Sequence, residues 1–269
     1  MTMLKYAFMT FSTPQQTLDE LLATAARYGY AGVEPRVSGQ QAHGIDVSLD
    51  ATQRGNVRGR FEASGVAMCC LAVSSRYADP ATVEQEVRDT AAFIDLAGDL
   101  ACPRLRVFGG ALPDGVSRDR AIAQVADALT SVAAQAAARG VTICLETHDA
   151  WTDPAHVAAV MEKVAHPNIA VNWDVMHPVR ASGSTMDEAY RALKPWIRHV
   201  HVHDGVNDES KLMFLPIGDG DFDHRRVVEL LVGDGYEGYV SGEWINWQPP
   251  ETHLPREIET LRGYEQALV

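Results

Sequence analysis

Four segments in the second half of the chain carry the residues best suited to chemistry. They read LETH, NWDVMH, HVHVH and SGE, and they contain Glu146, Asp174, three alternating histidines and Glu243. Each follows or ends an apolar run, where a buried carboxylate is costly unless it is paired or binds a cation. Two glutamates, an aspartate and a histidine, without a thiolate, suit Mn²⁺ or Mg²⁺ best and tolerate Co²⁺ or Zn²⁺. The sequence therefore predicts one divalent metal ion bound by these groups.

Each carboxylate also has a structural interpretation. Glu146 and Glu243 would then pair with neighbouring arginines, and Asp174 would cap the turn after its strand. We favour metal binding for all three because they stand at the C-terminal ends of expected strands, where barrel enzymes assemble their sites.

Five histidines accompany these carboxylates. His199, His201 and His203 alternate along one expected strand and therefore share a face of it. We expect at most two of them to reach a single metal ion, the deepest, His199, to be hydrogen-bonded in the core, and His203 to point into the next loop toward the substrate. His148 and His177 lie just beyond the carboxylates, where orienting a substrate hydroxyl and hydrogen-bonding to a ligand are equally good interpretations.

Three further residues are candidates for substrate binding. Glu34 and Arg36 share a face of an early strand, and we favour a structural ion pair between them over contact with a polar substrate. Trp244 follows Glu243 directly. Aromatic rings are natural platforms for the C–H faces of sugars, although core packing would explain most tryptophans in this region. The tryptophans near the expected ligands are Trp151, Trp173, Trp244 and Trp247.

Eight strand-helix units must position these residues. The expected strands are 6–11, 31–37, 66–74, 104–108, 141–147, 169–175, 197–202 and 239–245. The expected helices open near residue 13 and then span 51–64, 81–100, 117–139, 153–166, 186–196, 225–232 and 255–268. Short connections, no linker and no G-x-G-x-x-G turn favour an α/β fold of the (β/α)8 TIM barrel class, as a single domain over 1–269, rather than a doubly wound sheet.

Composition limits the partners. The 269 residues include 23 Lys and Arg against 36 Asp and Glu, a net charge of -13, which disfavours nucleic acid and anionic membranes as partners. The four cysteines show no C-x-x-C spacing and suggest reduced thiols. The first residues do not resemble a secretory signal, and no apolar run has membrane-spanning length. We expect a soluble, cytoplasmic protein with a small-molecule substrate, and a homo-oligomer is the default assembly.

The motifs resemble those of the xylose isomerase-like barrels, which include sugar isomerases and epimerases, hydroxypyruvate isomerase, inosose dehydratase and endonuclease IV. LETH, NWDVMH, HVHVHDG, PIGDGDFD and GYEGYVSGEW stand in the family's order, and GVEPR and HGI resemble its strand-two region. The resemblance implies that Glu146, Asp174, His201 and Glu243 are the metal ligands. In the family's ketose epimerases the two ligand glutamates also accept and donate the proton, and a histidine that matches His177 binds a substrate hydroxyl.

These parts support proton transfer next to a carbonyl. A metal ion polarises the C=O group, and Glu146 or Glu243 removes the neighbouring proton to give an enediolate. Return of the proton to the opposite face gives epimerisation, return to the adjacent carbon gives isomerisation, and loss of a β-hydroxyl gives dehydration. Asn207 stands where the family's ketose epimerases carry a substrate-binding arginine.

We therefore expect a metal-dependent sugar or polyol isomerase or epimerase. A dehydratase of the inosose dehydratase type is the alternative on the same site. An endonuclease IV-like phosphodiesterase would need more metal ions, for which only His177, Asp221 and His224 suggest extra ligands, and a basic face. A non-catalytic polyol-binding barrel is the remaining alternative. The loop NWQPPETHLP contains no Gly, Lys or Arg, which favours an unphosphorylated substrate.

Overall fold

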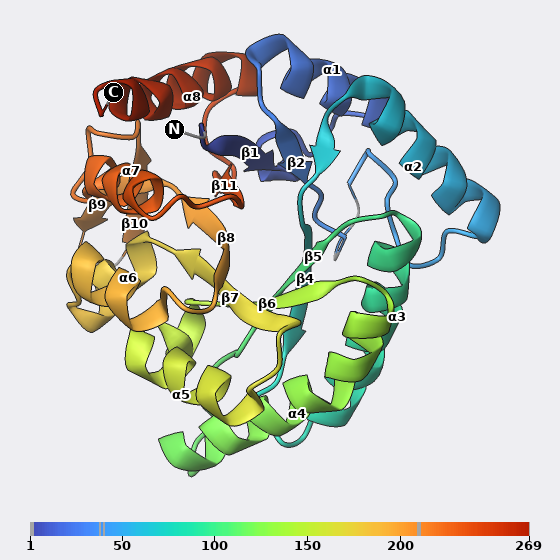
Figure 1. Ribbon diagram of the computed structural model, residues 1–269, viewed down its shortest axis with the longest axis vertical. Helices are drawn as coiled ribbons and strands as arrows, with labels where there is room; N and C mark the ends of the chain where they lie inside the picture. The colour runs from blue at the N-terminus through green and yellow to red at the C-terminus, as the bar shows by residue number, and fades with distance from the viewer. Residues whose placement is uncertain (1–2, 38, 40, 209–210, 269) are drawn as a thin grey trace.

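The computed structural model describes residues 3–37, 39, 41–208 and 211–268, which form a ring of parallel strands surrounded by helices (Figure 1). The strand order around the ring is β3-β2-β1-β11-β8-β7-β6-β5-β4. The ring strands are β1 (Lys5–Met9), β2 (Gly32–Glu34), β3 (Ala67–Met68), β4 (Leu71–Arg76), β5 (Arg104–Phe108), β6 (Thr142–Glu146), β7 (Ile169–Asp174), β8 (Ile197–Val202) and β11 (Tyr239–Gly242). The predicted (β/α)8 TIM barrel is confirmed.

The helices begin and end at the residues that local chemistry favours. They are α1 (Leu18–Tyr28), α2 (Ala51–Ser64), α3 (Val83–Asp99), α4 (Arg118–Ala138), α5 (Pro154–Val164), α6 (Met186–Leu193), α7 (His224–Gly233) and α8 (Pro250–Gln266). At the start of α1, Thr17 and Glu20 form a capping box, and Gly29 ends the helix with a φ of 76°. The described residues also form three short helical turns. These are Thr10–Ser12, Asp149–Trp151 and Pro178–Ser182.

The ring closes through one interrupted strand. The predicted strand 66–74 forms as two pieces, β3 and β4, separated at Cys69 and Cys70. The first piece pairs with β2 and the second with β5, so the same stretch of chain joins both neighbours. Backbone hydrogen bonds from Ala72 N to Pro35 O (2.9 Å) and from Val37 N to Ala72 O (3.0 Å) extend the contact toward the C-terminal end.

Strand β2, strand β11 and helix α8 also depart from their predicted bounds. Strand β2 covers only Gly32–Glu34 of the expected 31–37, because Pro35 has no N–H to continue the ladder. Strand β11 stops at Gly242, before a turn in which Asn246 adopts a φ of 50°. Helix α8 begins at Pro250, five residues before the expected start.

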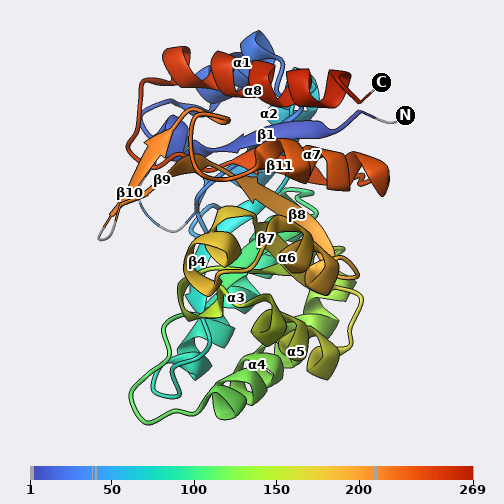
Figure 2. The ribbon, with the colours of Figure 1, turned by 90° about the vertical axis from the view of Figure 1, so that its left-hand side faces the viewer.

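A β-hairpin after β8 is absent from the sequence prediction. It consists of β9 (Asp204–Asp208) and β10 (Lys211–Leu215), and it projects beyond the barrel on the side opposite the two termini (Figure 2). The carboxylate of Asp204 accepts the backbone N–H groups of Gly205 (2.8 Å), Gly218 (2.8 Å) and Gly220 (3.2 Å). His224 Nδ1 lies 3.6 Å from the same carboxylate. Asp204 therefore connects the base of the hairpin to the start of α7.

The two ends of the chain meet at one side of the ring. Strand β1 pairs with β11 over Lys5–Phe8, and both termini lie near α8 in Figures 1 and 2. Glu265 of α8 accepts hydrogen bonds from Leu4 N (2.7 Å) and from the Tyr6 hydroxyl (3.2 Å). The first strand is thus held by the last strand and the last helix.

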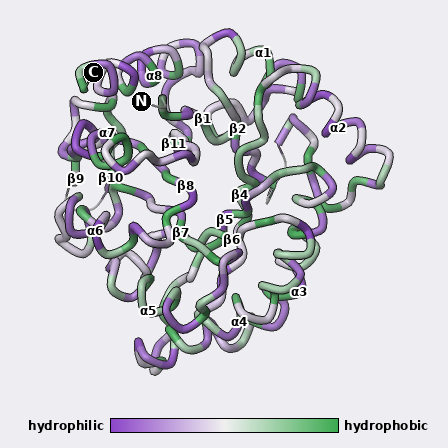
Figure 3. The backbone as a smooth tube through the Cα atoms, in the orientation of Figure 1, coloured by the Kyte–Doolittle hydropathy of each residue, from purple (hydrophilic) through white to green (hydrophobic). Residues whose placement is uncertain are grey.

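Apolar residues concentrate along the strands and on the inner faces of the helices, whereas α2 is mostly hydrophilic and buries only Phe61 (Figure 3). All four cysteines are buried and free, as predicted. Among the described residues, no helix combines the length and the apolar character needed to cross a bilayer.

Candidate metal centre and active site

Four side chains from neighbouring strands converge at the C-terminal end of the barrel. Glu146 ends β6, Asp174 ends β7, His201 lies in β8 and Glu243 follows β11. All four are buried, and one potential ligand atom of each lies within 4.8 Å of those of the others. The structure thus brings together the four residues that the family resemblance implied as ligands.

The strand register explains this convergence. Strands β7 and β8 place Asp174 opposite His201, and β8 and β11 place His201 opposite Ser241. Because side chains alternate along a strand, Glu243 then emerges on the same side as Ser241. The backbone N–H of Glu243 donates to Val202 O at 3.1 Å, which fixes its position just beyond the last ladder pair.

His201 lies at the middle of the cluster. Its Nδ1 is 3.2 Å from Glu146 Oε1 and 3.1 Å from Glu243 Oε2, and its Nε2 is 3.0 Å from Glu34 Oε2. Burial alone would lower the pKa of His201, but Glu34, Glu146 and Glu243 raise it well above its ordinary value. The space between these carboxylates therefore favours a positive charge.

The donor atoms fit a divalent cation. Glu146 Oε2, Asp174 Oδ2 and Glu243 Oε2 are buried and make no hydrogen bond to any described residue. The other oxygen of Asp174 accepts the N–H groups of Met176 (3.0 Å) and His177 (3.3 Å), which aims Oδ2 into the cluster. Burial alone would raise the pKa of Glu243, but mainly His201 lowers it to about 2. Three charged oxygens and one imidazole nitrogen are an appropriate set for Mn²⁺ or Mg²⁺.

Arg106 of β5 is a site residue that the sequence analysis missed. Its side chain is 1% exposed, and its Nε lies 3.2 Å from Glu146 Oε2, in contact but not aligned as a hydrogen bond. Its Nη1 donates to Val73 O at 3.0 Å. Burial alone would lower the pKa of Arg106, but Glu146, Glu243 and Glu34 raise it. The sequence feature that could have identified Arg106 is its place between apolar residues in the strand RLRVF, where a buried charge needs a partner.

Three histidine rings form a row beside the carboxylates. His203 Nε2 lies 2.9 Å from Asp174 Oδ2, again without hydrogen-bond alignment. The ring centroid of His177 is 5.6 Å from that of His203 and 4.5 Å from that of His148. His148 Nδ1 contacts Asp149 Oδ1 at 2.8 Å; burial alone would lower its pKa, but Asp149 and Glu146 raise it to about 9. The row places polar ring nitrogens beside the four clustered residues.

The sequence of residues 22–264 matches the model of a family described as the xylose isomerase-like TIM barrel. The chain belongs to this family. The match covers most of the barrel, including all four clustered residues, and it confirms the resemblance seen in the motifs.

Individual relatives of this xylose isomerase-like barrel are distant. A Mus musculus protein named "Putative hydroxypyruvate isomerase" is 27% identical over 177 residues, which are 61% of this chain and 60% of that protein. The chain thus spans about 60% of the length of this curated relative.

Solved structures show the same fold at low identity. A probable 3-DHS dehydratase from Bacillus anthracis has a TM-score of 0.80 and 18% identity, covering 96% of this chain and 99% of that one. A D-allulose 3-epimerase from Methylomonas sp., in complex with D-allulose, has a TM-score of 0.76 and 18% identity, covering 97% of both chains.

In this xylose isomerase-like barrel, Glu34 contacts histidines of β8 rather than Arg36, which corrects the expected ion pair. Glu34 Oε2 lies 2.8 Å from His199 Nε2, and both Glu34 oxygens lie within 3.1 Å of His201 Nε2. His199 is fully buried and hydrogen-bonded, as the sequence suggested. Arg36 instead lies over the ring of Phe11, 4.9 Å from its centroid. Pro35 lies between the two residues and has no N–H for the hydrogen bonds of the strand. Glu34 and Arg36 therefore need not point to the same face of the sheet.

Aromatic residues near β11 lie in two layers. Trp244 is 1% exposed and packs on His253 with ring centroids 5.0 Å apart, so its place in the structure is a core position rather than an open platform. Phe214 of β10 lies closer to the centre, 5.5 Å from the ring of His203 and 6.3 Å from that of Trp247. Phe214 was not a candidate from the sequence, because it lies in β10 and the β9–β10 hairpin was not predicted.

Proposed function

We propose that this protein is a divalent-metal-dependent isomerase or epimerase of small sugar-type hydroxy-carbonyl compounds. The observation that carries the proposal is the buried group of three carboxylate oxygens without hydrogen bonds around His201 Nδ1. Such a group is costly to bury without a cation, and barrel enzymes place their chemistry at this end of the strands. The relatives named for hydroxypyruvate isomerisation and allulose epimerisation support this reaction class.

Glu146, Asp174, His201 and Glu243 would hold the metal ion. When bound, the ion supplies Lewis acidity that makes a C–H bond next to a substrate carbonyl more acidic. Strands β6 and β11 are separated by β7 and β8, so Glu146 and Glu243 reach the centre from different sides. One glutamate, as the carboxylate, takes the proton from the carbon next to the carbonyl and leaves an enediolate, and the other, which begins the cycle protonated, gives its proton to the opposite face.

The neighbouring residues position these groups. Arg106 Nε lies 3.2 Å from Glu146 Oε2, the oxygen that faces the cluster, and would position this carboxylate. His148, His177 and His203 face the same space and would bind substrate hydroxyls. Return of the proton to the adjacent carbon in place of the opposite face gives an aldose-ketose isomerase. Loss of a β-hydroxyl from the enediolate as water, after it gains a proton, gives a dehydratase.

Solvent exchange tests the proposal. The Mn²⁺-loaded protein is incubated in D₂O with ketoses, inosose and hydroxypyruvate, and NMR follows deuterium at the carbon next to the carbonyl. We expect incorporation with at least one compound, and the product identifies isomerisation, epimerisation or dehydration. Absence of exchange and of product with the whole panel would refute the proposed chemistry.

Two variants test the catalytic glutamates. Glu146→Gln and Glu243→Gln should each lower kcat by at least about a hundredfold, because each removes an acid-base group. The matched control is Glu257→Gln, since Glu257 is a buried glutamate of α8 that accepts the N–H of Ile217 at 2.8 Å. Rates near that of the unmodified protein would exclude the corresponding glutamate from catalysis.

A further inference from the structure

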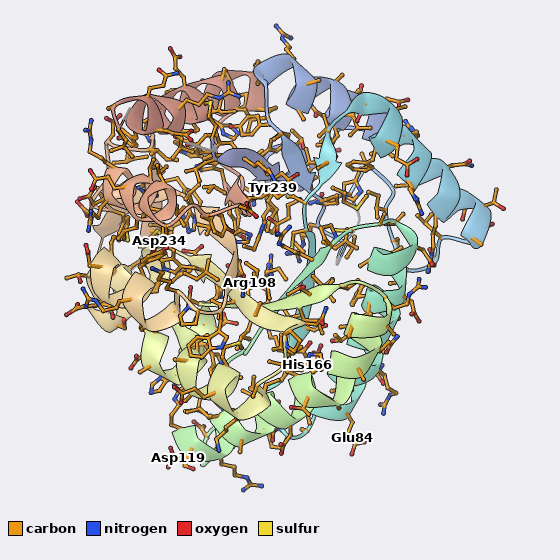
Figure 4. All side chains as sticks on the ribbon, viewed as in Figure 1. Glu84, Asp119, His166, Arg198, Asp234 and Tyr239 are labelled. Carbon is orange, nitrogen blue, oxygen red and sulfur yellow. The ribbon has the colours of Figure 1, made fainter. Side chains whose placement is uncertain are left out.

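An open groove of about 640 Å³ runs between α3 and α4 on the outside of the ring. The residues that line it lie in 83–88 of α3 and in 120–131 of α4. The two helices contact each other, and Figure 4 shows Glu84, which lines the groove, at the outer edge of the molecule beside α4. The groove is therefore a feature of the outer helical layer and not of the proposed metal centre.

Hydrogen bonds between the two helices fix the shape of this groove. Gln124 Nε2 of α4 donates to Tyr77 O at 2.6 Å, and the Tyr77 hydroxyl lies 2.7 Å from Thr90 Oγ1 of α3. One turn past the groove, Gln135 Nε2 of α4 donates to Ala91 O of α3 at 3.1 Å. The groove is thus formed by a rigid pair of helices and is already shaped before anything binds in it.

The α4 side of the groove is poor in charge for a helix in the outer layer. Between Ala121 and Ala138 the helix carries a single charged residue, Asp127. A helix with one face in water normally has charged and polar groups along that face. Val83 and Val87 of α3 add half-buried apolar side chains on the other side of the groove. An uncharged and partly apolar centre is typical of the core of a protein interface.

The groove is also electrically balanced in an acidic protein. Its charged residues are two acids and two bases, Glu84, Arg88, Arg120 and Asp127. The whole chain has a net charge of -13, so two copies repel each other on average. Approach of a second copy at a balanced surface avoids most of this repulsion.

Arg120 and Asp127 of α4 have no partners within their own chain. Both are exposed, and neither forms an ion pair with any residue that the structure describes. They are seven residues apart, which is almost two helical turns, so they lie on the same face of α4 and about 10 Å apart along its axis. That separation is too long for an ion pair between them.

A second copy of the chain would supply both missing partners. If two α4 helices pack antiparallel about a twofold axis between Ala123 and Gln124, position 120 of one helix lies opposite position 127 of the other. Arg120 then pairs with the partner's Asp127, and the axis repeats the pair. A twofold interface has to be complementary to itself in this way. The opposite charges at matched distances from one point therefore favour a second copy over a different protein.

We propose that the groove between α3 and α4 is the dimer interface of this protein, with the α4 helices of the two copies antiparallel across a twofold axis. The uncharged centre supplies the packed contact, and the two Arg120–Asp127 pairs set the register of the helices. This inference goes beyond the function proposed above and does not depend on the metal centre.

The mass of the protein in solution tests the interface. Sedimentation velocity and light scattering on the full chain, over a range of concentrations, give the oligomeric state and the dissociation constant. We expect a dimer with twice the mass of the 29.4 kDa chain. A monomer at every concentration up to about 100 µM would overturn the proposal, because a stable dimer would associate well below that concentration.

Charge variants identify the face. Asp127→Arg should raise the dissociation constant of the dimer by at least about 100-fold, because the twofold axis sets like charges opposite each other twice. Arg120→Asp should act in the same way. The double variant Arg120→Asp/Asp127→Arg exchanges the two charges, and it should bring the dissociation constant back to within about tenfold of the original.

Glu259→Arg is the matched control. Glu259 is an exposed acid of α8, outside the groove, and its replacement makes the same change in net charge as Asp127→Arg. It should leave the dissociation constant unchanged. Ala123→Glu, next to the expected axis, should dissociate the dimer by bringing two carboxylates together. Circular dichroism checks that each variant is folded.

The outcomes decide the proposal. Weaker association of both single charge variants, with recovery in the double variant, supports it. A dimer that the variants of Arg120, Ala123 and Asp127 leave unchanged would place the interface elsewhere and overturn it. A double variant that associates as poorly as the single variants would refute the reciprocal pairing and the antiparallel arrangement built on it.

Discussion

Single residues decide which atoms of the centre face one another. Glu34 lies within hydrogen-bond distance of His201 Nε2, at 3.0 and 3.1 Å, so this nitrogen is placed to donate a proton. With a metal ion bound, Nδ1 would carry the lone pair, on the side of the ring that faces Glu146 and Glu243. A carboxylate behind a metal-binding histidine fixes its tautomer and increases its basicity. Glu34 would therefore act as a positioning residue for the proposed metal site.

Replacing Glu34 should weaken metal binding without removing a ligand. We expect Glu34→Gln to raise the dissociation constant for Mn²⁺ by about 10- to 100-fold, because the amide no longer stabilises the required tautomer. The EPR signal of free Mn²⁺ measures this in a titration without substrate. Glu257→Gln is again the matched control, and equal affinities in the two variants would contradict the role.

The sequence allowed Glu146, Asp174 and Glu243 to be found because each ends or follows an apolar run, whereas only the family resemblance selected His201 from three alternating histidines. Arg106 and the partners of Glu34 were not predictable in this way. Their positions depend on which strands lie opposite one another across the ring, since Glu34 of β2 meets His199 and His201 of β8. One sequence does not contain that information in its local periodicity.

At the scale of elements, the β9–β10 hairpin adds an aromatic side chain and a link to α7 that the barrel strands do not provide. It places Phe214 against His203, and it is joined to the start of α7 through Asp204. Strands β5 and β8 matched their predicted bounds because each is a short run with apolar residues at alternate positions, Leu105 and Val107 in the first and Val200 and Val202 in the second. The hairpin escaped prediction because its stability comes from tertiary contacts, which no short segment reveals.

Asp204→Asn should destabilise the fold. The amide has one acceptor oxygen in place of two, so buried N–H groups lose a charged partner at a cost of about 1.5–3 kcal/mol. Burial alone would raise the pKa of Asp204, but His224 and the backbone N–H groups of Gly218 and Gly205 lower it. Its contribution is therefore present above the unfolded-state pKa, about 4, and is lost as the pH falls through the lower folded-state pKa.

Urea unfolding at pH 7 and at decreasing pH measures this difference. The gap in the free energy of unfolding between the original protein and Asp204→Asn should be largest near neutral pH and should shrink below pH about 4. A gap that does not change with pH would show that the charge of Asp204 contributes nothing.

At the scale of the whole molecule, the buried carboxylates would couple metal binding at the proposed site to the stability of the fold. Four acidic groups, Glu34, Glu146, Asp174 and Glu243, lie in or beside the centre, and all are buried. A cation that binds the folded chain and not the unfolded chain stabilises it by mass action. The net charge of -13 adds a general attraction for cations.

Mn²⁺ should therefore raise the melting temperature. At a free concentration of 100 times the dissociation constant, we expect a rise of about 5–10 °C, reversed by EDTA, with about one ion bound per chain. Differential scanning calorimetry with metal analysis measures both quantities. Asp174→Asn should lose most of the rise, whereas the same melting temperature with and without Mn²⁺ would argue against a site that binds only the native state.

The pairing of β1 with β11 has a consequence for biosynthesis. Strand β11 seals the gap between β1 and β8, and Glu243 follows it directly. A nascent polypeptide that has not yet emerged from the ribosome beyond residue 239 lacks both the strand that joins β1 to β8 and Glu243, the fourth proposed ligand. Maturation of the centre and completion of the ring are therefore one late event, and a truncated translation product can have neither.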